Sequence, residues 1–367
     1  MQARVHRIPA AAPDDFSGIA ALAAAGALRP DRVVAVLGKT EGNGCVNDFS
    51  RGFATSALKA GFASLAGLPA EEIGQRMLFV MSGGTEGGLS PHWLLFETAD
   101  DAAPPVPGRK ALALGIARTR AFAAHEIGRM PQVRATAAAV GTAMAAAGID
   151  DPADVHYVQV KCPLLTRARI EQAAAAGQNV ATEETYASMG VSRGASALGV
   201  ALALGEVNAA ALRDSVICHD HRLFSRRASA SAGVELLENQ ILVVGNSDRW
   251  SGDLLVAHDL MADAIDAAAF ARALAAAGLA PALPLAASES ARLVAVLAKA
   301  EAARSGSIRG ARHTMLDDSD IQASRHARAL VGGVLAAVAG TTLLFVSGGA
   351  EHQGPDGGGP VAVIARR

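Results

Sequence analysis

Short apolar runs recur along this sequence and alternate with longer stretches in which alanine dominates. Uninterrupted runs of aliphatic and β-branched residues are typical of buried strands, whereas long alanine-rich stretches favour helices. The apolar runs predict strands at Val33–Leu37, Met77–Met81, Trp93–Glu97, Lys110–Thr119, Val155–Val160, Ile241–Val244, Leu293–Leu297 and Leu343–Val346. The alanine-rich stretches predict helices over Ser17–Leu28, from Asp48 to about Leu65, over Pro131–Ala147, before Gly278, and from Val191 and Ala323 onward.

The order of these elements occurs three times. Each pass begins with a helix that ends in Ala-Ala-Ala-Gly, at Gly26, Gly148 and Gly278. A strand then leads to a lysine, and a Ser-Arg pair lies at or near the start of an alanine-rich helix. Each pass closes with the pattern Ser-Gly/Ala-Gly-x-Glu, at Ser82–Glu86, Ser231–Glu235 and Ser347–Glu351. Four landmarks that recur in one order indicate related units rather than chance.

Two polar segments separate these units. Thr98–Gly108 is rich in proline and aspartate and reads as a linker, and Asn246–Asp253 is a polar break. We therefore predict an α/β fold of three homologous α/β repeat units, residues 1–104, 109–248 and 253–367, arranged with pseudo-threefold symmetry around a central site.

Composition and charge narrow the classes of function. The 367 residues can bury a large core, and the formal net charge of -2 gives no reason to expect nucleic acid or an anionic membrane as a partner. No apolar run reaches the roughly 20 residues that a membrane helix needs, and the N-terminus lacks the apolar core of a signal peptide. Three widely spaced cysteines favour a reduced, cytoplasmic setting, and no CxxC or HExxH pattern is present to hold zinc.

Each unit places a lysine, an arginine and a serine at corresponding positions. These residues are Lys39, Lys161 and Lys299; Arg51, Arg193 and Arg325; and Ser82, Ser231 and Ser347. If the units pack around a pseudo-threefold axis, the side chains meet in a cationic cleft suited to a small, oxygen-rich, acidic ligand. Crowded cations and burial lower the pKa of a lysine, which can then accept a proton from a serine hydroxyl. The glycines after each serine let backbone N–H groups approach a developing oxyanion.

Three other interpretations compete with this hypothesis. Gly38-Lys39-Thr40 matches the end of a nucleotide-binding P-loop, but Val33 stands where that motif requires glycine. One isolated Ser-Gly-Gly turn would indicate only a strand-to-loop connection. A non-catalytic protein that clamps an anion with the same residues stays open as an alternative to an enzyme.

The motifs resemble those of the ring-opening amidohydrolases, the family of cyanuric acid hydrolase and barbiturase. The resemblance covers essentially the whole chain and rests on Gly38–Gly44, Met81–Gly87, Ser229–Glu235 and Ser347–Pro355. It implies a threefold pseudosymmetric α/β fold, usually assembled as a homotetramer, with the active site on the threefold axis. The implied reaction is hydrolytic ring opening of cyanuric acid to carboxybiuret, which yields biuret and CO₂. Opening of barbituric acid to ureidomalonate is the second possibility, and side chains near Ser324 decide between the two cyclic imides.

The resemblance also implies unequal roles for the three serine–lysine pairs. The middle pair carries the chemistry, with Ser231 as nucleophile and Lys161 as its base. Lys39 and Lys299 belong to supporting pairs, and the residues implied to bind substrate are Arg51, Ser82, Gly83, Arg193, Ala232, Arg325 (or Arg328, one turn along the same helix), Ser347 and Gly348. Only the middle unit has alanine, Ala232, directly after its serine.

A structural divalent cation near the C-terminus is a further implication, whereas no organic cofactor is implied. Its ligands would be the carboxylate of Glu301 and backbone oxygens of Ala350, Gln353, Gly354, Pro355 and Gly358. Oxygen ligands of this kind suit a hard cation such as Mg²⁺ or Ca²⁺.

Overall fold

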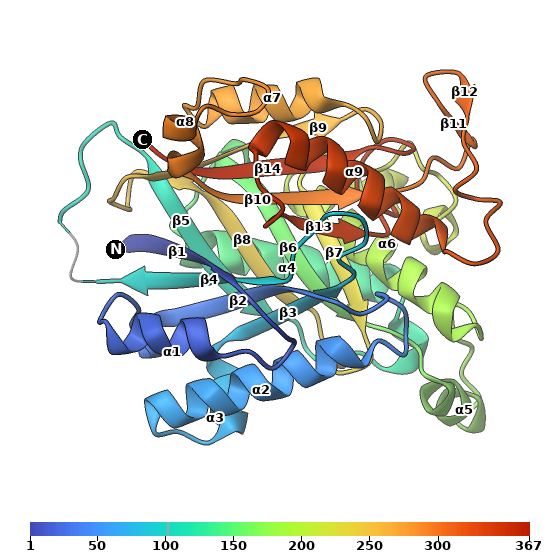
Figure 1. Cartoon of the computed structure of the whole chain (residues 1–367). Coiled ribbons are helices and arrows are strands. Elements are labelled where there is room, and N and C mark those ends of the chain that lie inside the picture. The colour runs from blue at the N-terminus through green and yellow to red at the C-terminus, as the bar shows by residue number, and fades with distance from the viewer. Residues whose placement is uncertain (101–102) are drawn as a thin grey trace.

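The structure is a computed structural model that describes residues 1–100 and 103–367 (Figure 1). Its strands form three four-stranded sheets and one two-stranded hairpin. The predicted division into 1–104, 109–248 and 253–367 cuts no strand of these sheets. Residues 101 and 102 of the predicted linker lie outside the described residues.

The three units share the succession strand, helix, strand, helix, strand, strand, to which each unit adds further short elements. The first unit contains β1 (Gln2–Pro9), α1 (Ser17–Ala24), β2 (Val33–Thr40), α2 (Phe49–Ala66), α3 (Ala70–Arg76), β3 (Leu78–Gly83) and β4 (His92–Ala99). The second contains β5 (Ala111–Arg118), α4 (Met130–Ala146), β6 (Val155–Pro163), α5 (Arg167–Ala175), α6 (Thr185–Ala203), β7 (Ala228–Gly233) and β8 (Gln240–Ser247). The third contains β9 (Leu254–Met261), α7 (Ala267–Ala276), α8 (Ala287–Arg292), β10 (Leu293–Ala300), β11 (Ser307–Ile308), β12 (Ala311–Arg312), α9 (Ala323–Ala339), β13 (Phe345–Gly348) and β14 (Gly359–Arg366).

The strand order is the same in all three sheets. It is β1-β4-β2-β3 in the first unit, β5-β8-β6-β7 in the second and β9-β14-β10-β13 in the third. In each sheet the last strand of the unit pairs antiparallel with two others, and the lysine-bearing strand pairs parallel with the serine-bearing one. The prediction of three homologous α/β units is therefore confirmed.

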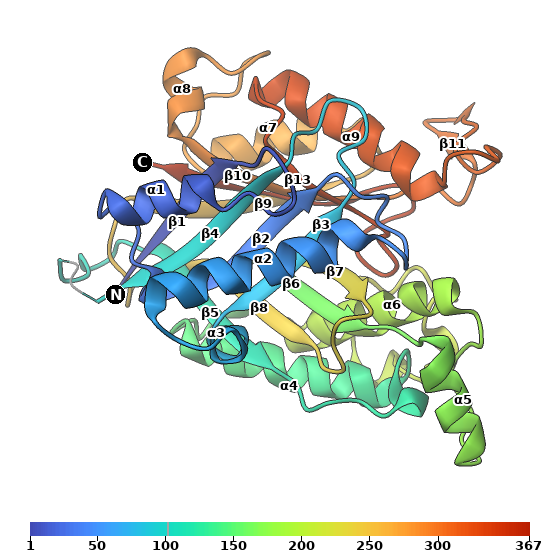
Figure 2. The same ribbon diagram turned by 60° about the horizontal axis from the view of Figure 1, so that its bottom comes forward.

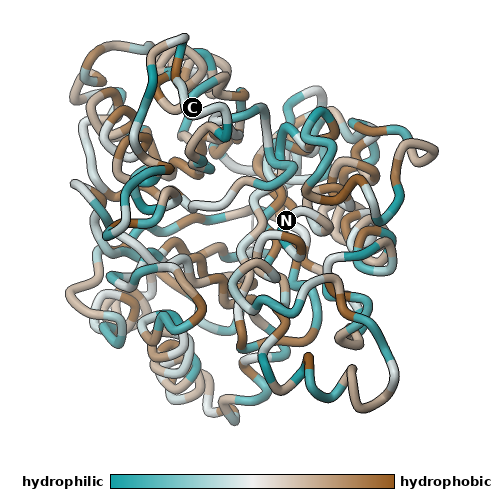
Figure 3. The backbone as a smooth tube through the Cα atoms, turned by 90° about the vertical axis from the view of Figure 1, so that its right-hand side faces the viewer, coloured by the Kyte–Doolittle hydropathy of each residue, from teal (hydrophilic) through white to brown (hydrophobic). Residues whose placement is uncertain are grey.

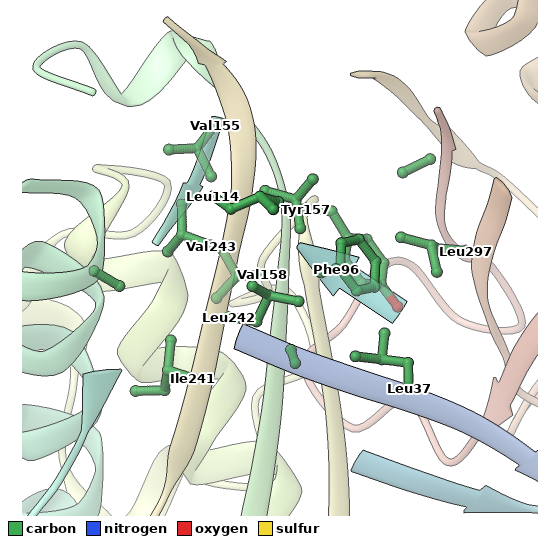
Figure 4. Close-up of a cluster of buried hydrophobic side chains, with 14 of the residues drawn as sticks. Leu37, Phe96, Leu114, Val155, Tyr157, Val158, Ile241, Leu242, Val243 and Leu297 are labelled. Atoms are coloured by element: carbon green, nitrogen blue, oxygen red, sulfur yellow. The ribbon is translucent and has the colours of Figure 1, made fainter. Parts of the chain in front are cut away.

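The inner faces of the three sheets share one hydrophobic core. Residues of all three units contact one another there, including Leu37 and Phe96 from the first, Tyr157 from the second and Leu297 from the third (Figure 4). The helices cover the outer faces, with α2 across the first sheet, α4 and α6 across the second and α7 and α9 across the third (Figure 2). Because each sheet is covered on both faces, central strands such as β2 and β10 are almost wholly buried, which is why continuous apolar runs mark them in the sequence.

Several elements differ from the prediction. The strands β1, β9 and β14 were not predicted, and neither was β7, whose sequence Ala-Ser-Ala-Ser-Ala-Gly has low β propensity. Small side chains suit β7 because this strand lies where the three units converge and is buried along its whole length. Helix α6 begins at Thr185 rather than Val191, so that Ser192 and Arg193 lie in its third turn instead of at its start.

Hydrophilic residues are spread over the peripheral loops and do not gather on one side (Figure 3). Among the residues described, no helix is long and apolar enough to cross a membrane.

Candidate active site

The parallel strand pairs bring each predicted lysine beside the predicted serine of its own unit. Lys39 is the register partner of Ser82 in β2 and β3, Lys161 of Ser231 in β6 and β7, and Lys299 of Ser347 in β10 and β13. All three lysines are fully buried. The three pairs thus occupy equivalent positions in three equivalent sheets.

One small cavity lies between the three units. It is lined by Gly44, Arg51, Met81, Ser82, Gly83, Met189, Arg193, Ser231, Ala232, Arg328, Ser347 and Gly348. Its volume of ≈ 30 Å³ is about a tenth of the smallest cavities that usually hold drug-sized ligands. Such a space is far too small for a nucleotide.

The lysines link neighbouring units in a cyclic pattern. Lys39 Nζ donates to Val346 O at 2.8 Å, Lys161 Nζ to Met81 O at 3.1 Å, and Lys299 Nζ to Ala230 O at 2.9 Å. Each acceptor directly precedes the serine of the adjacent unit. Each lysine therefore belongs to one unit and bonds to the serine-bearing strand of the next, so these three bonds join the units around the axis.

The serine hydroxyls are not bonded equivalently. Lys39 Nζ lies 3.4 Å from Ser82 Oγ, and Lys299 Nζ lies 3.4 Å from Ser347 Oγ. Ser231 Oγ instead shares a hydrogen bond of 3.1 Å with Ser347 Oγ. Among the hydrogen bonds of the described residues none joins Lys161 to Ser231, and the ammonium group of Lys161 lies 3.0 Å from Glu235 Oε1. The middle pair therefore differs from the other two in its contacts as well as in its sequence.

The arginines and the motif glutamates form the outer part of the site. Arg193 binds Glu351 through two hydrogen bonds of 2.8 and 2.6 Å, and Arg328 binds Glu86 through two of 2.9 and 2.7 Å. Gly84 and Gly349 have positive φ angles of 106° and 76°, and a Cβ at either would lie 2.5 to 2.6 Å from these arginines. Glycine at these two positions thus gives the arginines space to reach the glutamates.

The structure distinguishes Arg328 from Arg325 in the third unit. The side chain of Arg328 is only 4% exposed and lines the cavity, whereas that of Arg325 is 34% exposed and contacts Glu86 from outside. Of the two arginines predicted for this position, Arg328 corresponds to Arg51 and Arg193 as a lining residue. The Ser-Arg pattern suggested Arg325 because it ignores where each helix begins relative to the cavity.

The structure also explains which residue type follows each of the outer serines. A Cβ at Gly83 would lie 1.7 Å from Asp48 Oδ2, and one at Gly348 would lie 2.6 Å from Arg328 Nη1. Alanine at either position would therefore require the buried side chain of Asp48 or Arg328 to move. At Ala232 the backbone carbonyl accepts a hydrogen bond of 3.0 Å from Arg51.

Burial lowers the pKa of all three lysines, but to different extents. Burial and the positive charge of Arg328 hold the pKa of Lys39 well below its usual value. Burial and Arg193 lower the pKa of Lys299 to about 7. Burial also lowers the pKa of Lys161, while the Glu235 carboxylate opposes that fall. Lysines in this environment can exchange protons near neutral pH, as a serine–lysine mechanism requires.

Sequence reasoning gave no role to the glutamates Glu86, Glu235 and Glu351. They form the last position of the repeated Ser-Gly/Ala-Gly-x-Glu pattern, and this recurrence was the signal that could have identified them. Asp48 was likewise predicted only to open a helix. In the structure it is buried, caps α2 through the Ser50 N–H and lies 3.5 Å from Arg51 Nε.

The residues predicted to hold a cation lie together in a separate place. The turn that contains Ala350, Gln353, Gly354, Pro355 and Gly358 is largely buried, and the Ala350 N–H donates to Glu301 Oε2. Burial and the neighbouring Glu351 carboxylate raise the pKa of Glu301 to about 7. Within residues 1–100 and 103–367 no three His, Cys, Asp or Glu side chains cluster closely enough to hold a metal ion.

Comparison with known proteins gives the family. A sequence model of the amidohydrolase ring-opening protein family matches residues 4–366. A cyanuric acid amidohydrolase of Azorhizobium caulinodans is 58% identical over 100% of this chain and 98% of its own length. One of Ectopseudomonas oleovorans is 57% identical over 100% of both chains.

Solved structures agree with the sequence comparisons. A cyanuric acid hydrolase, described as an evolutionary innovation by structural concatenation, is 50% identical and superposes with a TM-score of 0.95 over 100% of this chain and 99% of the other. The cyanuric acid hydrolase from A. caulinodans superposes with a TM-score of 0.91 at 58% identity, with coverage of 100% and 99%. With matching sequence, fold and repeat order along its whole length, this chain belongs to the ring-opening amidohydrolase family.

Proposed function

We propose that this protein hydrolyses cyanuric acid, opening its ring at one C–N bond. The observation that carries the proposal is the cavity itself, where serines and arginines from three equivalent units converge. A planar ring with three equivalent carbonyl groups matches three equivalent sets of donors. The relatives named cyanuric acid amidohydrolase, at 57 to 58% identity over the full chain, support this substrate over other cyclic imides.

In the first step Ser231 Oγ attacks one ring carbonyl carbon, and its proton passes to Lys161 Nζ. Donors around the cavity stabilise the oxyanion of the tetrahedral intermediate. When the intermediate collapses, the ring C–N bond breaks and Lys161 returns the proton to the departing nitrogen. The product of this step is an acyl-enzyme on Ser231.

Water then attacks the acyl carbon and gives its proton to Lys161, and Lys161 passes this proton to Ser231 Oγ as the acyl bond breaks. The released product, carboxybiuret, loses CO₂ to give biuret. Arg51, Arg193 and Arg328 hold substrate oxygens, and Ser82 and Ser347 bind the two carbonyl groups that do not react. The choice of Ser231 and Lys161 rests on the family resemblance. It is supported by the place of Ser231 in the cavity lining and by the register of Lys161 beside it.

The substrate is tested by a paired assay with purified protein. Loss of cyanuric acid and loss of barbituric acid are followed side by side, with biuret measured as the product of the first. We expect turnover of cyanuric acid and at least about a hundredfold lower kcat/KM for barbituric acid, in which one ring N–H is replaced by CH₂ and a polar partner is left unpaired. Equal or faster turnover of barbituric acid would identify the protein as a barbiturase instead.

We also propose that the turn at residues 350–358 binds a structural Mg²⁺ or Ca²⁺ ion with Glu301. The fit is supported by the donor set, which consists of one carboxylate and backbone carbonyl oxygens, the ligands that hard cations prefer. It is supported further by the two adjacent carboxylates of Glu301 and Glu351, whose repulsion a bound cation would reduce. The ion would tie Glu301 to this turn, which also reaches the nucleophile strand because Gln353 Oε1 accepts from the Ala230 N–H at 2.7 Å.

Removing divalent cations is expected to lower the melting temperature by roughly 5 °C, and Mg²⁺ or Ca²⁺ should restore it. The ordinary pKa of a glutamate is 4.5, and in the folded protein without a cation the pKa of Glu301 is raised to about 7. Because the folded state holds this proton more tightly than the unfolded state does, the stability falls as the pH rises from 4.5 to 7. The cation should therefore stabilise most above pH 7. Melting curves with chelator at pH 5.5 and pH 8 check this, and Glu301→Gln should abolish the response. A melting temperature that ignores both chelator and Glu301→Gln would contradict the cation site.

Two further properties complete the proposal. We propose a homotetramer, as the family resemblance implies, and light scattering in solution would decide the oligomer size. A cytoplasmic setting is supported by the free thiols of Cys45, Cys162 and Cys218, and fractionation of the source cells would test it. The absence of a nucleic-acid partner stays a prediction from the net charge.

A further inference from the structure

The three motif glutamates do not have equivalent partners. Glu86 of the first unit binds Arg328 of the third, and Glu351 of the third binds Arg193 of the second. The same cyclic relation would pair Glu235 of the second unit with Arg51 of the first. Glu235 binds Lys161 instead, with 3.0 Å between Oε1 and Nζ. The pseudo-threefold symmetry is thus broken at one ion pair, which lies beside the proposed nucleophile.

A single residue, the N-cap of α2, accounts for this difference. Asp48 precedes Arg51 by three residues and forms an ion pair with it, at 3.5 Å from Nε. The corresponding positions, three residues before Arg193 and Arg328, are occupied by Gly190 and Arg325. Only the first unit therefore supplies its own carboxylate to the arginine, and Glu235 is left free to bind the lysine.

Asp48 is held firmly in this position. One carboxylate oxygen accepts from the Ser50 N–H at 3.0 Å and the Ser50 hydroxyl at 2.6 Å, and the other accepts from the Gly44 N–H at 2.8 Å. Arg51 is oriented in turn by the carbonyl groups of Ala232 and Cys45. The arrangement depends on the negative charge of Asp48, because asparagine could keep the cap but not the ion pair.

We propose that Asp48 and Glu235 are positioning residues that make the middle serine–lysine pair the reactive one. Asp48 neutralises Arg51, and Glu235 consequently stabilises the ammonium form that Lys161 reaches when it takes the proton of Ser231. Within the part of the chain that the structure describes, no carboxylate forms an ion pair with Lys39 or Lys299, because Glu86 and Glu351 are bound by arginines. They stay suited to donating hydrogen bonds to the serines that bind substrate. This inference rests on the proposed function for its catalytic consequence but not for the ion pair itself.

Two charged groups and one neutral thiol face Lys161. They are Glu235 from the segment after β7, Arg51 from α2 and the thiol of Cys162 from β6 itself. Glu235 also faces Arg169 of α5, whose side chain bonds to the carbonyl groups on either side of Glu235. Removing the charge of Glu235 removes the carboxylate that favours the charged lysine. Removing the charge of Asp48 leaves Arg51 uncompensated, which repels that charged form and attracts Glu235. Both changes must lower the pKa of Lys161.

The test uses the full-length protein and two measurements. The chain contains five lysines, of which Lys59 and Lys110 lie outside the site, so carbon-13 labelling of lysine gives a readable NMR titration of each Cε. In the unchanged protein Lys161 should titrate at a higher pH than Lys39 and Lys299. In Glu235→Gln and in Asp48→Asn its titration should move down by about one pH unit. The double variant should move further than Glu235→Gln alone but by less than the sum of the two single shifts. In the double variant Arg51 still repels the ammonium form of Lys161, but there is no Glu235 carboxylate for it to attract.

The pH dependence of kcat provides the second measurement. The base must be neutral to accept a proton, so the acid limb of the kcat profile should move to lower pH by the same amount in both variants. The maximal kcat should fall about tenfold because a weaker base is left. Glu86→Gln is the matched control, since it removes an equivalent glutamate that does not face Lys161. It should raise KM and leave the acid limb in place. Any contribution of substrate ionisation to the pH profile is the same for all variants, so it does not affect the comparison.

Opposite results overturn the proposal in recognisable ways. If the Lys161 titration stays within 0.2 pH unit in both Glu235→Gln and Asp48→Asn, the two carboxylates do not control this lysine. If Glu86→Gln moves the limb equally, the effect is not specific to the middle pair. If the titration moves as expected but neither cyanuric nor barbituric acid is consumed by the unchanged protein, the proposed function fails while the ion-pair relation stands.

Discussion

Replacing Ser231 with alanine is expected to lower kcat for cyanuric acid by about 10⁴- to 10⁶-fold, the range seen when a nucleophile is removed. The side chain is almost completely buried, and its hydroxyl contacts Ser347 Oγ at 3.1 Å. Alanine removes only this oxygen from a strand that already consists of small residues, so the fold should persist. Turnover measured with the purified variant, against a blank without enzyme, gives the size of the loss.

The same variant separates an enzyme from an anion-binding protein. The arginines and the outer serines remain, so cyanuric acid should still bind, with a dissociation constant within a few fold of its value in the unchanged protein. Ser82→Ala is the matched control because it removes the equivalent hydroxyl of the first unit. It should raise KM with a much smaller effect on kcat. Turnover retained by Ser231→Ala, or lost equally in Ser82→Ala, would contradict the assignment of the nucleophile.

Replacing Lys161 with methionine is expected to lower kcat by about 10²- to 10⁴-fold, which is the usual contribution of a positioned base. Methionine has a similar length and no charge, so the space behind Ser231 stays filled. The variant leaves the Glu235 carboxylate without its ammonium partner, and some loss of stability is expected from an unpaired buried charge. Melting curves must therefore accompany the kinetics. If Lys161→Met is unstable, the double variant Lys161→Met/Glu235→Gln, which removes the unpaired charge, should restore stability.

Lys299→Met is the comparison that decides the route of the proton. In this structure Ser231 Oγ contacts Ser347 Oγ, which in turn contacts Lys299 Nζ at 3.4 Å. A proton could leave Ser231 along this chain and end on a lysine whose pKa burial and Arg193 lower to about 7. We expect Lys299→Met to retain most of kcat. A collapse in Lys299→Met with activity kept in Lys161→Met would instead assign the base to Lys299 through Ser347.

Much of the architecture could be predicted from the chain. The apolar runs at Val33–Leu37 and Leu293–Leu297 became β2 and β10, because strands covered on both faces need no polar positions. Strand β7 escaped prediction because its serines and alanines carry no strand signal of their own. Its conformation depends on parallel pairing with β6, which lies about 70 residues earlier.

The serines, lysines and two of the three lining arginines could be named because they recur at matching positions. Arg328 was only an alternative, because a sequence motif does not show which turn of a helix lies beside the cavity. Glu235 had no predicted role for a related reason. Its choice of Lys161 over Arg51 depends on Asp48, a residue of another unit, and the three meet only after the units have packed together.

By itself, the sequence determined that three α/β units repeat, which chemical groups each contributes and which family they resemble. These are local properties, because the motifs and the order of the elements can be recognised from the residues of each unit without any tertiary contact. Only the tertiary structure decided which arginine lines the cavity, which serine contacts which, and which carboxylate compensates which cation. Most of those choices are contacts between units, made by residues more than a hundred positions apart in the sequence, and small differences at equivalent positions break the symmetry of the repeat.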